Sequence, residues 1–325
     1  MKVAVVGAGA VGGVVAWHLA GAGAAPVIVA RPESAARLAR DGLIVTGPSG
    51  TKTVTVEASW DARALGARDL VLVGLKAHDW PAALPAIAPL LGPETIVIPM
   101  LNGVPWWYFQ GVKGPWSDRR IKAVDPDGAI AAAIPARSIL GCVVYTGASR
   151  EAPHRIRWNG VARLVLGEPA GGMSERLRGT AEFLRSVRLD AEATPDIRQA
   201  VWHKILGNVA HNPLSVVTGA TMGHLAAAPH LNAIRRTMME ETVAVADALG
   251  IGRFDVEERL KLSPALEDFR TSMLQDFEEG RPLELGAIVD AVVELGTAAG
   301  VDTPVLATIG ALALERWLNT HGSRI

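Results

Sequence analysis

The first hundred residues alternate between short apolar runs and longer Ala-rich stretches. The runs lie at residues 3–6, 27–30, 69–76 and 95–101, and polar and apolar positions do not alternate within them. This pattern predicts strands buried on both faces, as in a parallel sheet covered by helices. Residues 137–168 alternate more strongly and have few residues between their runs, which indicates hairpins that finish the sheet.

From residue 196 onward the apolar positions recur with the period of an α-helix. One predicted helix ends at Gly250, and Ser263 with Pro264 predicts the start of another that Gly280 closes. One face of the first helix carries Ile234, Met238, Thr242, Val245 and Leu249.

Two more helices are marked by their ends. One begins at Pro282 and stops at Gly300, and the other begins at Thr303 with Pro304. The buried side of the first carries Leu285, Ile288, Val292 and Leu295. We therefore predict an α/β fold, with an N-terminal Rossmann-type doubly wound parallel sheet over residues 1–195 and an all-helical C-terminal domain over residues 196–325.

Composition excludes several classes of protein. The 325 residues are 49% hydrophobic and 20% charged with a formal net charge of -1, which argues against a disordered chain and against a nucleic-acid binder. The single cysteine, Cys142, excludes an intramolecular disulfide and a zinc site built from cysteines. The eight histidines have no HxxxH or HxH spacing, so we expect no metal site.

Two uncharged stretches, residues 3–30 and 205–229, raise the question of a membrane segment. Glycines and Pro26 interrupt the first, and Asn208, His211 and Asn212 lie in the second, where hydrocarbon would leave their polar groups unpaired. We expect both to be buried globular interior, no membrane association, and a cytoplasmic location.

A GxGxxG motif follows the first apolar run directly and precedes a helix. Gly7 permits a tight turn, Gly9 lets the backbone approach a pyrophosphate, and Gly12 lets helix and strand pack closely. The helix N-terminus adds free N–H groups and a positive dipole. The alternative is a glycine-rich turn without a nucleotide. The predicted strand, helix and second strand follow one another in the order expected of a dinucleotide-binding unit, which favours a dinucleotide site.

The end of the second strand bears on the cofactor. NAD sites place a carboxylate there for the ribose hydroxyls, whereas this chain has Ala30 and then Arg31, a cation suited to a 2′-phosphate. Lys76 adds a second cation at the carboxyl edge of the sheet, where ligands bind in such folds. This pattern favours NADP, although Arg31 alone could be a solvated surface charge.

Three polar residues form a ladder along one helix in the C-terminal part. Lys204, Asn208 and Asn212 are spaced i, i+4, i+8 and share a face, and we expect Pro213 to end the helix. This arrangement indicates a polar site, or else buried hydrogen bonds at the seam between domains.

Three further residues have ordinary explanations when each is taken alone. Glu284 could be a charge in the first turn of a helix, Ser272 a small polar residue within one, and Asn102 part of an Asn-Gly turn. Asn102 also lies at the carboxyl end of a sheet strand, where a carboxamide can face a nicotinamide.

Taken together, these residues resemble the ketopantoate reductases (2-dehydropantoate 2-reductases), the NADPH-dependent enzymes of pantothenate biosynthesis. The resemblance spans residues 3 to about 304. Its matching pieces are GAGAVG at 7–12, Arg31, LKA at 75–77, NG at 102–103, WHKILGNVAHNPL at 202–214, SMLQD at 272–276 and LEL around Glu284.

The resemblance implies an oxidoreductase with Lys204 as general acid and Glu284 beside it. Asn102, Asn208, Asn212 and Ser272 would bind a small 2-oxo acid. The NADP cofactor would be held by Gly7, Ala8, Gly9, Ala10, Val11, Gly12, Arg31, Lys76, Asn102 and Glu284.

The chain departs from the family's pattern at three places. Phe269 and Met222 replace polar residues, usually Asn, and residues 104–128 form an insertion. The insertion carries the aromatic residues Trp106, Trp107, Tyr108, Phe109 and Trp116, which would form either a lid or a loop packed on the protein itself or a second subunit. These departures favour a more apolar oxo acid than ketopantoate.

Two other functions stay open at this point. A different 2-oxo acid or imine could be reduced on the same scaffold, or the chain could be an NADPH-binding sensor without chemistry. The presence of both Lys204 and Glu284 counts against a sensor, since it would need neither. The apolar helices are compatible with a homodimer.

Overall fold

The computed structural model describes residues 1–261 and 269–322 of the chain, which folds into two compact units. The first, called the sheet unit, comprises Met1–Leu101, Trp107–Arg119 and Gly128–Ile197. The second, called the helical unit, comprises Asn102–Trp106, Arg120–Asp127 and Arg198–Ile325. Asn102 thus belongs to the unit that also contains Lys204, although it directly follows a strand of the sheet unit.

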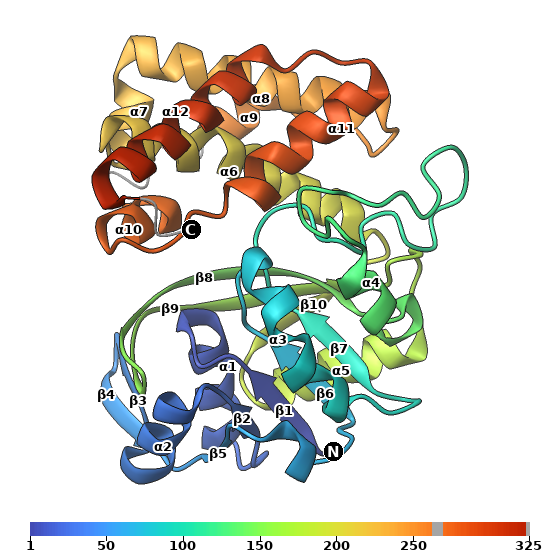
Figure 1. The fold of residues 1–325 in the computed structure, drawn as a ribbon, viewed down its shortest axis with the longest axis vertical. Helices are drawn as coiled ribbons and strands as arrows, with labels where there is room; N and C mark the ends of the chain where they lie inside the picture. The colour runs from blue at the N-terminus through green and yellow to red at the C-terminus, as the bar shows by residue number, and fades with distance from the viewer. Residues whose placement is uncertain (262–268, 323–325) are drawn as a thin grey trace. The chain divides into compact units, whose positions relative to one another are not determined.

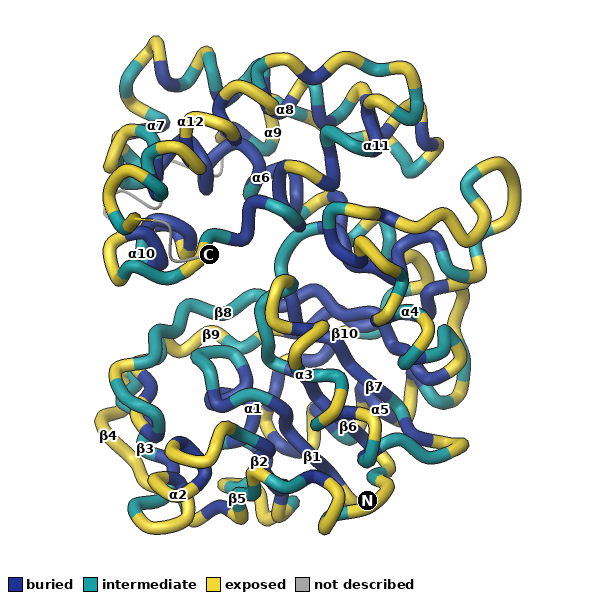
Figure 2. The backbone as a smooth tube through the Cα atoms, viewed as in Figure 1, coloured by how far each residue is buried: buried dark blue, intermediate teal, exposed yellow. Residues whose placement is uncertain are grey.

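The sheet unit contains a five-stranded, all-parallel sheet in the order β5-β2-β1-β6-β7 (Figure 1). Four of its strands confirm the predicted apolar runs, and they are buried almost throughout (Figure 2). The chain leaves β1 toward β2 on one side and returns toward β6 on the other, so the strand order reverses beside β1. The elements are β1 (Val3–Val6), α1 (Ala10–Gly21), β2 (Val27–Val29), α2 (Pro32–Asp41), β5 (Glu57–Ser59), β6 (Leu70–Val73), α3 (Trp80–Ile87) and β7 (Ile96–Pro99).

A second sheet has the order β10-β9-β3-β4, with β8 paired to β9. The predicted hairpin in residues 137–168 is present as the antiparallel pair β8–β9, two long curved strands in Figure 1. Our expectation that it finishes the first sheet holds only at Ile139, which forms a parallel bridge with Val97 of β7. The hairpin itself belongs to the second sheet, because β9 pairs with β3 and β10. The elements are β3 (Leu43–Gly47), β4 (Gly50–Val54), α4 (Ala129–Ala133), β8 (Gly141–Ala152), β9 (Arg155–Gly167), α5 (Glu175–Ser186) and β10 (Asp190–Ala193).

Helix α1 explains why the second sheet exists. Its residues Val14, Val15 and Leu19 belong to one hydrophobic core with strands of both sheets. At Gly13 a Cβ would come within 2.8 Å of the Ile156 side chain on β9. Since α1 presents apolar surface on opposite sides, β8 and β9 cover the side that the parallel sheet leaves exposed.

Helices make up most of the described part of the helical unit. The helix predicted to end at Gly250 is confirmed as α8, and Met238, Thr242 and Val245 are buried on it. The elements are α6 (Ile197–Thr218, within this unit from Arg198), α7 (Met222–Ala227), α8 (Pro229–Ala248), α9 (Val256–Lys261), α10 (Ser272–Glu278), the π-helix η6 (Gly286–Asp290), α11 (Ala291–Ala299) and α12 (Pro304–His321). Among the described residues, no helix combines the length and the apolar character needed to cross a bilayer.

One predicted helix start falls outside the described residues, and another lies three residues later than expected. Ser263 and Pro264 fall outside the described residues, and the helix before Gly280 begins at Ser272, with the Thr271 hydroxyl accepting from the Leu274 N–H at 3.1 Å. The helix expected from Pro282 begins at Leu285, so Glu284 directly precedes it instead of lying in its first turn.

The start of α12 is at Pro304 as predicted, but its cap is not the Thr303 side chain. The two carboxylate oxygens of Glu241 on α8 accept the N–H groups of Val305 and Leu306, each at 2.9 Å. A charged acceptor from another helix therefore supplies the cap that the sequence suggested was local.

Candidate active site

The glycine motif forms a tight turn between β1 and α1. Gly7 has a φ of +94°, which favours glycine, and a Cβ on Gly12 would lie 2.0 Å from the Gly7 carbonyl oxygen. A Cβ on Gly9 would meet only the Gly74 oxygen, at 3.6 Å. Gly7 and Gly12 thus set the turn itself, whereas the missing side chain at Gly9 leaves the backbone accessible to a ligand.

The first turn of α1 is suited to an anion. Gly9 is the N-cap and offers no side-chain acceptor, and the first turn contains no acidic residue. The N–H groups of this turn, which includes Ala10 and Val11, therefore remain available to phosphate oxygens at the positive end of the helix dipole. The neighbouring Ala8 is 7% exposed and packs into the core.

The loop lies where the strand order reverses, between β1 and β6. The Gly74 N–H donates to the Val6 carbonyl at 2.8 Å, so the ends of these strands stay together. Lys76 follows β6 and is partly buried, and Arg31 follows β2 and is exposed at the N-cap of α2. Both cations therefore lie at the carboxyl edge of the sheet, where open α/β sheets bind their ligands, and the residues present fit a dinucleotide.

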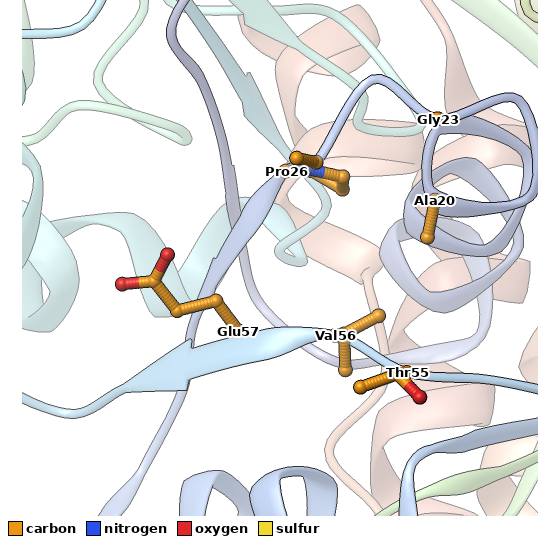
Figure 3. Close-up of a pocket in the computed structure, with 7 residues that line it drawn as sticks. Ala20, Gly23, Pro26, Thr55, Val56 and Glu57 are labelled. Atoms are coloured by element: carbon orange, nitrogen blue, oxygen red, sulfur yellow. The ribbon is translucent and has the colours of Figure 1, made fainter.

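A pocket of about 430 Å³ in the same unit is not part of this arrangement. Figure 3 shows Pro26 just before β2 and Glu57 at the start of β5 among its lining residues, with Ala20 of α1. These are the amino ends of parallel strands, opposite to the edge that carries the glycine loop. Its location argues against a nucleotide site.

In the helical unit, the Lys204 ammonium donates a hydrogen bond to the Asn102 Oδ1 at 2.7 Å. Both residues are partly buried. The acceptor is a neutral carboxamide, so the bond orients the amine without placing a negative charge on it at that contact. Sequence periodicity could not show this pairing, because the two residues are separated by 102 positions.

The loop that carries Asn102 lies against the π-helix. Gly103 has a φ of +84°, and a Cβ there would lie 2.3 Å from the Ala287 carbonyl oxygen. The same oxygen accepts the Val104 N–H at 2.8 Å. The Asn-Gly turn is therefore more than a change of chain direction, because glycine is required for the close approach that fixes Asn102.

Helix α6 does not end at Pro213, and this expectation was wrong. It continues to Thr218 with the proline inside. The His211 Nδ1 bonds to the Gly207 carbonyl at 2.6 Å, and the Ser215 hydroxyl donates to the Asn212 carbonyl at 2.7 Å. These side chains supply hydrogen bonds around the position where proline removes a backbone donor.

The predicted polar ladder on α6 is graded in burial. Lys204 and Asn208 are partly buried, and Asn212 is 5% exposed. Glu284 is 6% exposed in the same unit, whereas Ser272 is exposed at the first position of α10. The structure thus brings Lys204 to Asn102 directly and places the other four candidates on α6, on α10 and before the π-helix.

A buried cluster formed by His211 of α6 and Arg235 of α8 was missed from the sequence. Arg235 of α8 is fully buried, and its Nη2 donates to the His211 Nε2 at 2.9 Å. Burial, then the charge of Arg235, lowers the pKa of His211 to about 3, and burial lowers the pKa of Arg235 to about 10. His211 is therefore neutral in the folded protein.

The two substitutions relative to the family's pattern lie next to each other. The Met222 N–H donates to the Phe269 carbonyl at 2.9 Å. Phe269 is 40% exposed and precedes Ser272 by three residues. Their backbones are therefore adjacent, so the two replacements lie in one region of the helical unit.

Four of the five aromatic residues of the insertion are buried in the protein, and Trp116 is partly buried. Trp106, Trp107, Tyr108 and Phe109 are each at most 4% exposed. Phe109 stacks on Trp116 at 6.1 Å between ring centroids. Of the two alternatives, burial favours a loop packed on the body of the protein over an aromatic lid.

Comparison with known proteins identifies the family. The model described as "Ketopantoate reductase PanE/ApbA" matches residues 3–171, and the one described as "Ketopantoate reductase PanE/ApbA C terminal" matches residues 196–316. The chain belongs to the ketopantoate reductase family. It is therefore an enzyme, an oxidoreductase of this family. The predicted fold class, a Rossmann-type sheet followed by helices, is confirmed.

Three similar proteins show how far the family likeness extends. A 2-dehydropantoate 2-reductase of Mesorhizobium japonicum is 43% identical over 97% of this chain and 99% of its own length. A crystal structure from Ralstonia solanacearum MolK2 superposes with a TM-score of 0.93 at 40% identity, covering 99% of this chain and 98% of its own. D-mandelate dehydrogenase, solved with NADH and anilino(oxo)acetate, shares the fold with a TM-score of 0.86 at 20% identity over 98% of this chain and 99% of its own.

Proposed function

We propose that this enzyme reduces a 2-oxo acid to the 2-hydroxy acid with NADPH, and that its substrate is 2-dehydropantoate (ketopantoate), which becomes pantoate. The observation that carries the proposal is the Lys204 ammonium held by the Asn102 carboxamide at 2.7 Å. Membership of the ketopantoate reductase family supports the substrate class. When bound, NADPH would supply the hydride.

Lys204 is the general acid of this proposal. As the ketone carbon gains a hydride, the electron pair of its C=O bond moves to the oxygen, and that oxygen takes a proton from the Lys204 ammonium. Before the proton moves, the positive charge stabilises the developing alkoxide. Asn102 fixes the direction of the amine. The buried carboxylate of Glu284 is the third group of the proposed catalytic site.

Asn208, Asn212 and Ser272 are proposed to bind the substrate's carboxylate and hydroxyl groups. Carboxamides and a hydroxyl can donate hydrogen bonds without adding a charge that would compete with Lys204. Asn208 and Asn212 follow Lys204 at successive turns of α6, which supports a substrate lying along this helix.

The cofactor is proposed to lie over the glycine turn of the sheet unit. Gly7 and Gly12 set the turn, Gly9 leaves the backbone accessible, and Arg31 offers a guanidinium to a 2′-phosphate. The absence of a carboxylate at Ala30 and Arg31 favours NADPH over NADH. NADH remains the comparison cofactor because D-mandelate dehydrogenase, with the same fold, was solved with it.

A more apolar 2-oxo acid is the second candidate substrate. The observation that favours it is the contact of Met222 with Phe269, close to Ser272. Apolar side chains at this surface would bind a hydrocarbon or aromatic substituent better than a hydroxyl.

The test follows NADPH absorbance with ketopantoate and a panel of bulkier 2-oxo acids, for the native enzyme and Lys204→Ala. We expect kcat to fall by about 10²- to 10⁴-fold in the variant, as for the loss of a general acid. His203→Ala is the matched control, because His203 is the exposed neighbour of Lys204 on α6.

Several outcomes separate the candidates. Turnover of ketopantoate that is lost in Lys204→Ala supports the proposal, and preference for bulkier acids favours the second substrate. NADPH binding without turnover of any 2-oxo acid would indicate a sensor. An unchanged kcat in Lys204→Ala would refute the assigned acid.

A further inference from the structure

We propose that Glu294 is a positioning residue for the Asn102–Lys204 pair, and that the two ends of the insertion, at residues 103–104 and 122–123, support the general acid from the side of the π-helix. This inference rests on the proposed function and deepens it. The insertion then has a definite task, which is to hold the carboxamide that orients the amine.

Glu294 fixes the returning end of the insertion. Its two carboxylate oxygens accept the N–H groups of Lys122 and Ala123, each at 2.9 Å. Glu294 lies on α11 and is partly buried, and these hydrogen bonds span more than 170 positions of sequence. Hydrogen bonds from backbone N–H groups to a carboxylate are about twice as strong as neutral ones.

The outgoing end of the insertion packs on Ala287 of the π-helix, next to a contact of the returning end. The Val104 N–H donates to the Ala287 carbonyl, and Gly103 lies so close to that oxygen that a Cβ would be 2.3 Å away. On the adjacent residue, a Cβ at Gly286 would lie 2.9 Å from the Ala123 carbonyl. Residues 103–104 and 122–123 therefore pack on one turn of helix, next to Asn102.

The turn that receives both ends is part of the π-helix Gly286–Asp290. π-helical turns are rare and are frequently found at functional sites. Glu284 precedes this π-helix by two residues, so the turn that receives both ends of the insertion and the proposed carboxylate of the active site share one short segment. Release of residues 122–123 from Glu294 would remove one of the contacts that hold the insertion beside Asn102, in addition to the Val104–Ala287 hydrogen bond.

A shift of the Asn102 carboxamide relative to Lys204 should change both kcat and the pH dependence of kcat. A displacement of about 1 Å in a catalytic contact can cost about 10²-fold in rate. Loss of the acceptor also removes a hydrogen bond to the charged amine, which disfavours the ammonium form. Reduction needs that form, so the alkaline limb of the kcat profile should move to lower pH.

The test compares Glu294→Ala with Glu241→Ala. Glu241 makes the same pair of hydrogen bonds, to Val305 and Leu306 at 2.9 Å each, at the start of α12. Both variants lose two N–H···carboxylate bonds in the same unit, so both should have a lower melting temperature. Only Glu294→Ala should lower kcat, by about 10- to 100-fold, and shift the pH profile, with the KM for NADPH unchanged.

Glu294→Gln serves as the conservative variant and as the fallback if Glu294→Ala does not fold. It keeps one acceptor oxygen in place, so it should retain a larger part of kcat than the alanine variant. The inference would be overturned if kcat and its pH profile were the same in the native enzyme, in Glu241→Ala and in both Glu294 variants. If Glu294→Ala does not fold, Glu294→Gln alone supplies this comparison.

A second measurement separates this inference from the proposed function. If the native enzyme reduces no 2-oxo acid, the proposed function fails. Amide hydrogen exchange of residues 102–106 then still tests whether Glu294 holds this segment in position. Faster exchange of this segment in the Glu294 variants than in Glu241→Ala supports positioning. Exchange at the native rate overturns it.

Discussion

At the scale of single residues, the same residue type has different tasks at neighbouring positions. Gly7 supplies a positive φ, Gly12 supplies the space for a close approach, and Gly9 leaves the backbone open. The GxGxxG pattern predicted all three, because each task forbids a side chain for a local reason. Lys204 differs, since its hydrogen-bond partner Asn102 is not near it in sequence.

Gly12→Ala should disrupt the turn between β1 and α1. The new Cβ would lie 2.0 Å from a backbone oxygen, which cannot move as a flexible side chain could. We expect a loss of about 1–3 kcal/mol in the free energy of unfolding and weaker NADPH binding, measured by urea unfolding and cofactor fluorescence. Gly179→Ala, in the exposed middle of α5 with open space at its Cβ, should instead be neutral or stabilising by up to about 1 kcal/mol.

Arg31→Ala should weaken NADPH binding and leave NADH binding unchanged. A hydrogen bond to a charged group contributes about 1.5–3 kcal/mol, so the KM for NADPH should rise by about 10- to 100-fold. Steady-state kinetics with both cofactors measures the effect. Arg37→Ala removes another exposed guanidinium from α2 and should change neither KM; a parallel rise for NADPH and NADH would argue against contact of Arg31 with the 2′-phosphate.

At the scale of elements, α6 shows how side chains can override a helix-breaking residue. Pro213 predicts an end, yet His211 and Ser215 bond to backbone carbonyls of the helix and it continues to Thr218. The buried Arg235 fixes the tautomer of His211. The Arg235 guanidinium can only donate, so the His211 Nε2 is the acceptor and the proton is on Nδ1. A contact with α8 thus orients a side chain that bonds to the backbone of the helix that carries Lys204.

This cluster should make stability depend on pH. In the unfolded chain His211 binds a proton near its ordinary pKa of about 6.5, whereas in the folded protein burial and Arg235 lower that pKa to about 3. Below about pH 6.5 the unfolded state therefore binds one more proton, and stability falls as pH falls, by about 1.4 kcal/mol per pH unit. Between about pH 7 and pH 5 the native protein should lose about 2 kcal/mol more than His211→Gln.

Urea unfolding at the two pH values measures that difference. His203→Gln, on the exposed side of the same helix, is the reference for replacing an imidazole as such. If His211→Gln and the native protein lose the same stability on acidification, the neutral buried histidine is not the cause.

At the scale of the whole molecule, cofactor binding and proton donation are assigned to different units. The glycine turn and Arg31 belong to the sheet unit, and Lys204 with Asn102 belongs to the helical unit. Binding of NADPH should therefore survive the loss of the general acid.

Calorimetry with and without cofactor tests this division. At about 100 times its dissociation constant, NADPH should stabilise the protein by about 2.7 kcal/mol. Lys204→Ala should show the same rise in melting temperature, whereas Gly12→Ala should show little. An equal rise with the same concentration of NADH would contradict the preference for NADPH.

The sequence by itself determined the features that depend on neighbours along the chain. Uninterrupted apolar runs specified the strands of the parallel sheet, the glycine spacing specified the turn, and helical period placed Lys204, Asn208 and Asn212 on one face. The family likeness rests on the same local segments. Burial and backbone sterics act over a few residues, so they leave a readable pattern.

Only the tertiary structure decided which distant groups meet. Glu241 caps α12, Glu294 holds residues 122–123, and Asn102 accepts from Lys204, each from a separate part of the chain. The second sheet also forms because α1 has two sides to cover. Hydrogen bonds between residues this far apart depend on how the elements pack, and no local period or spacing encodes that packing.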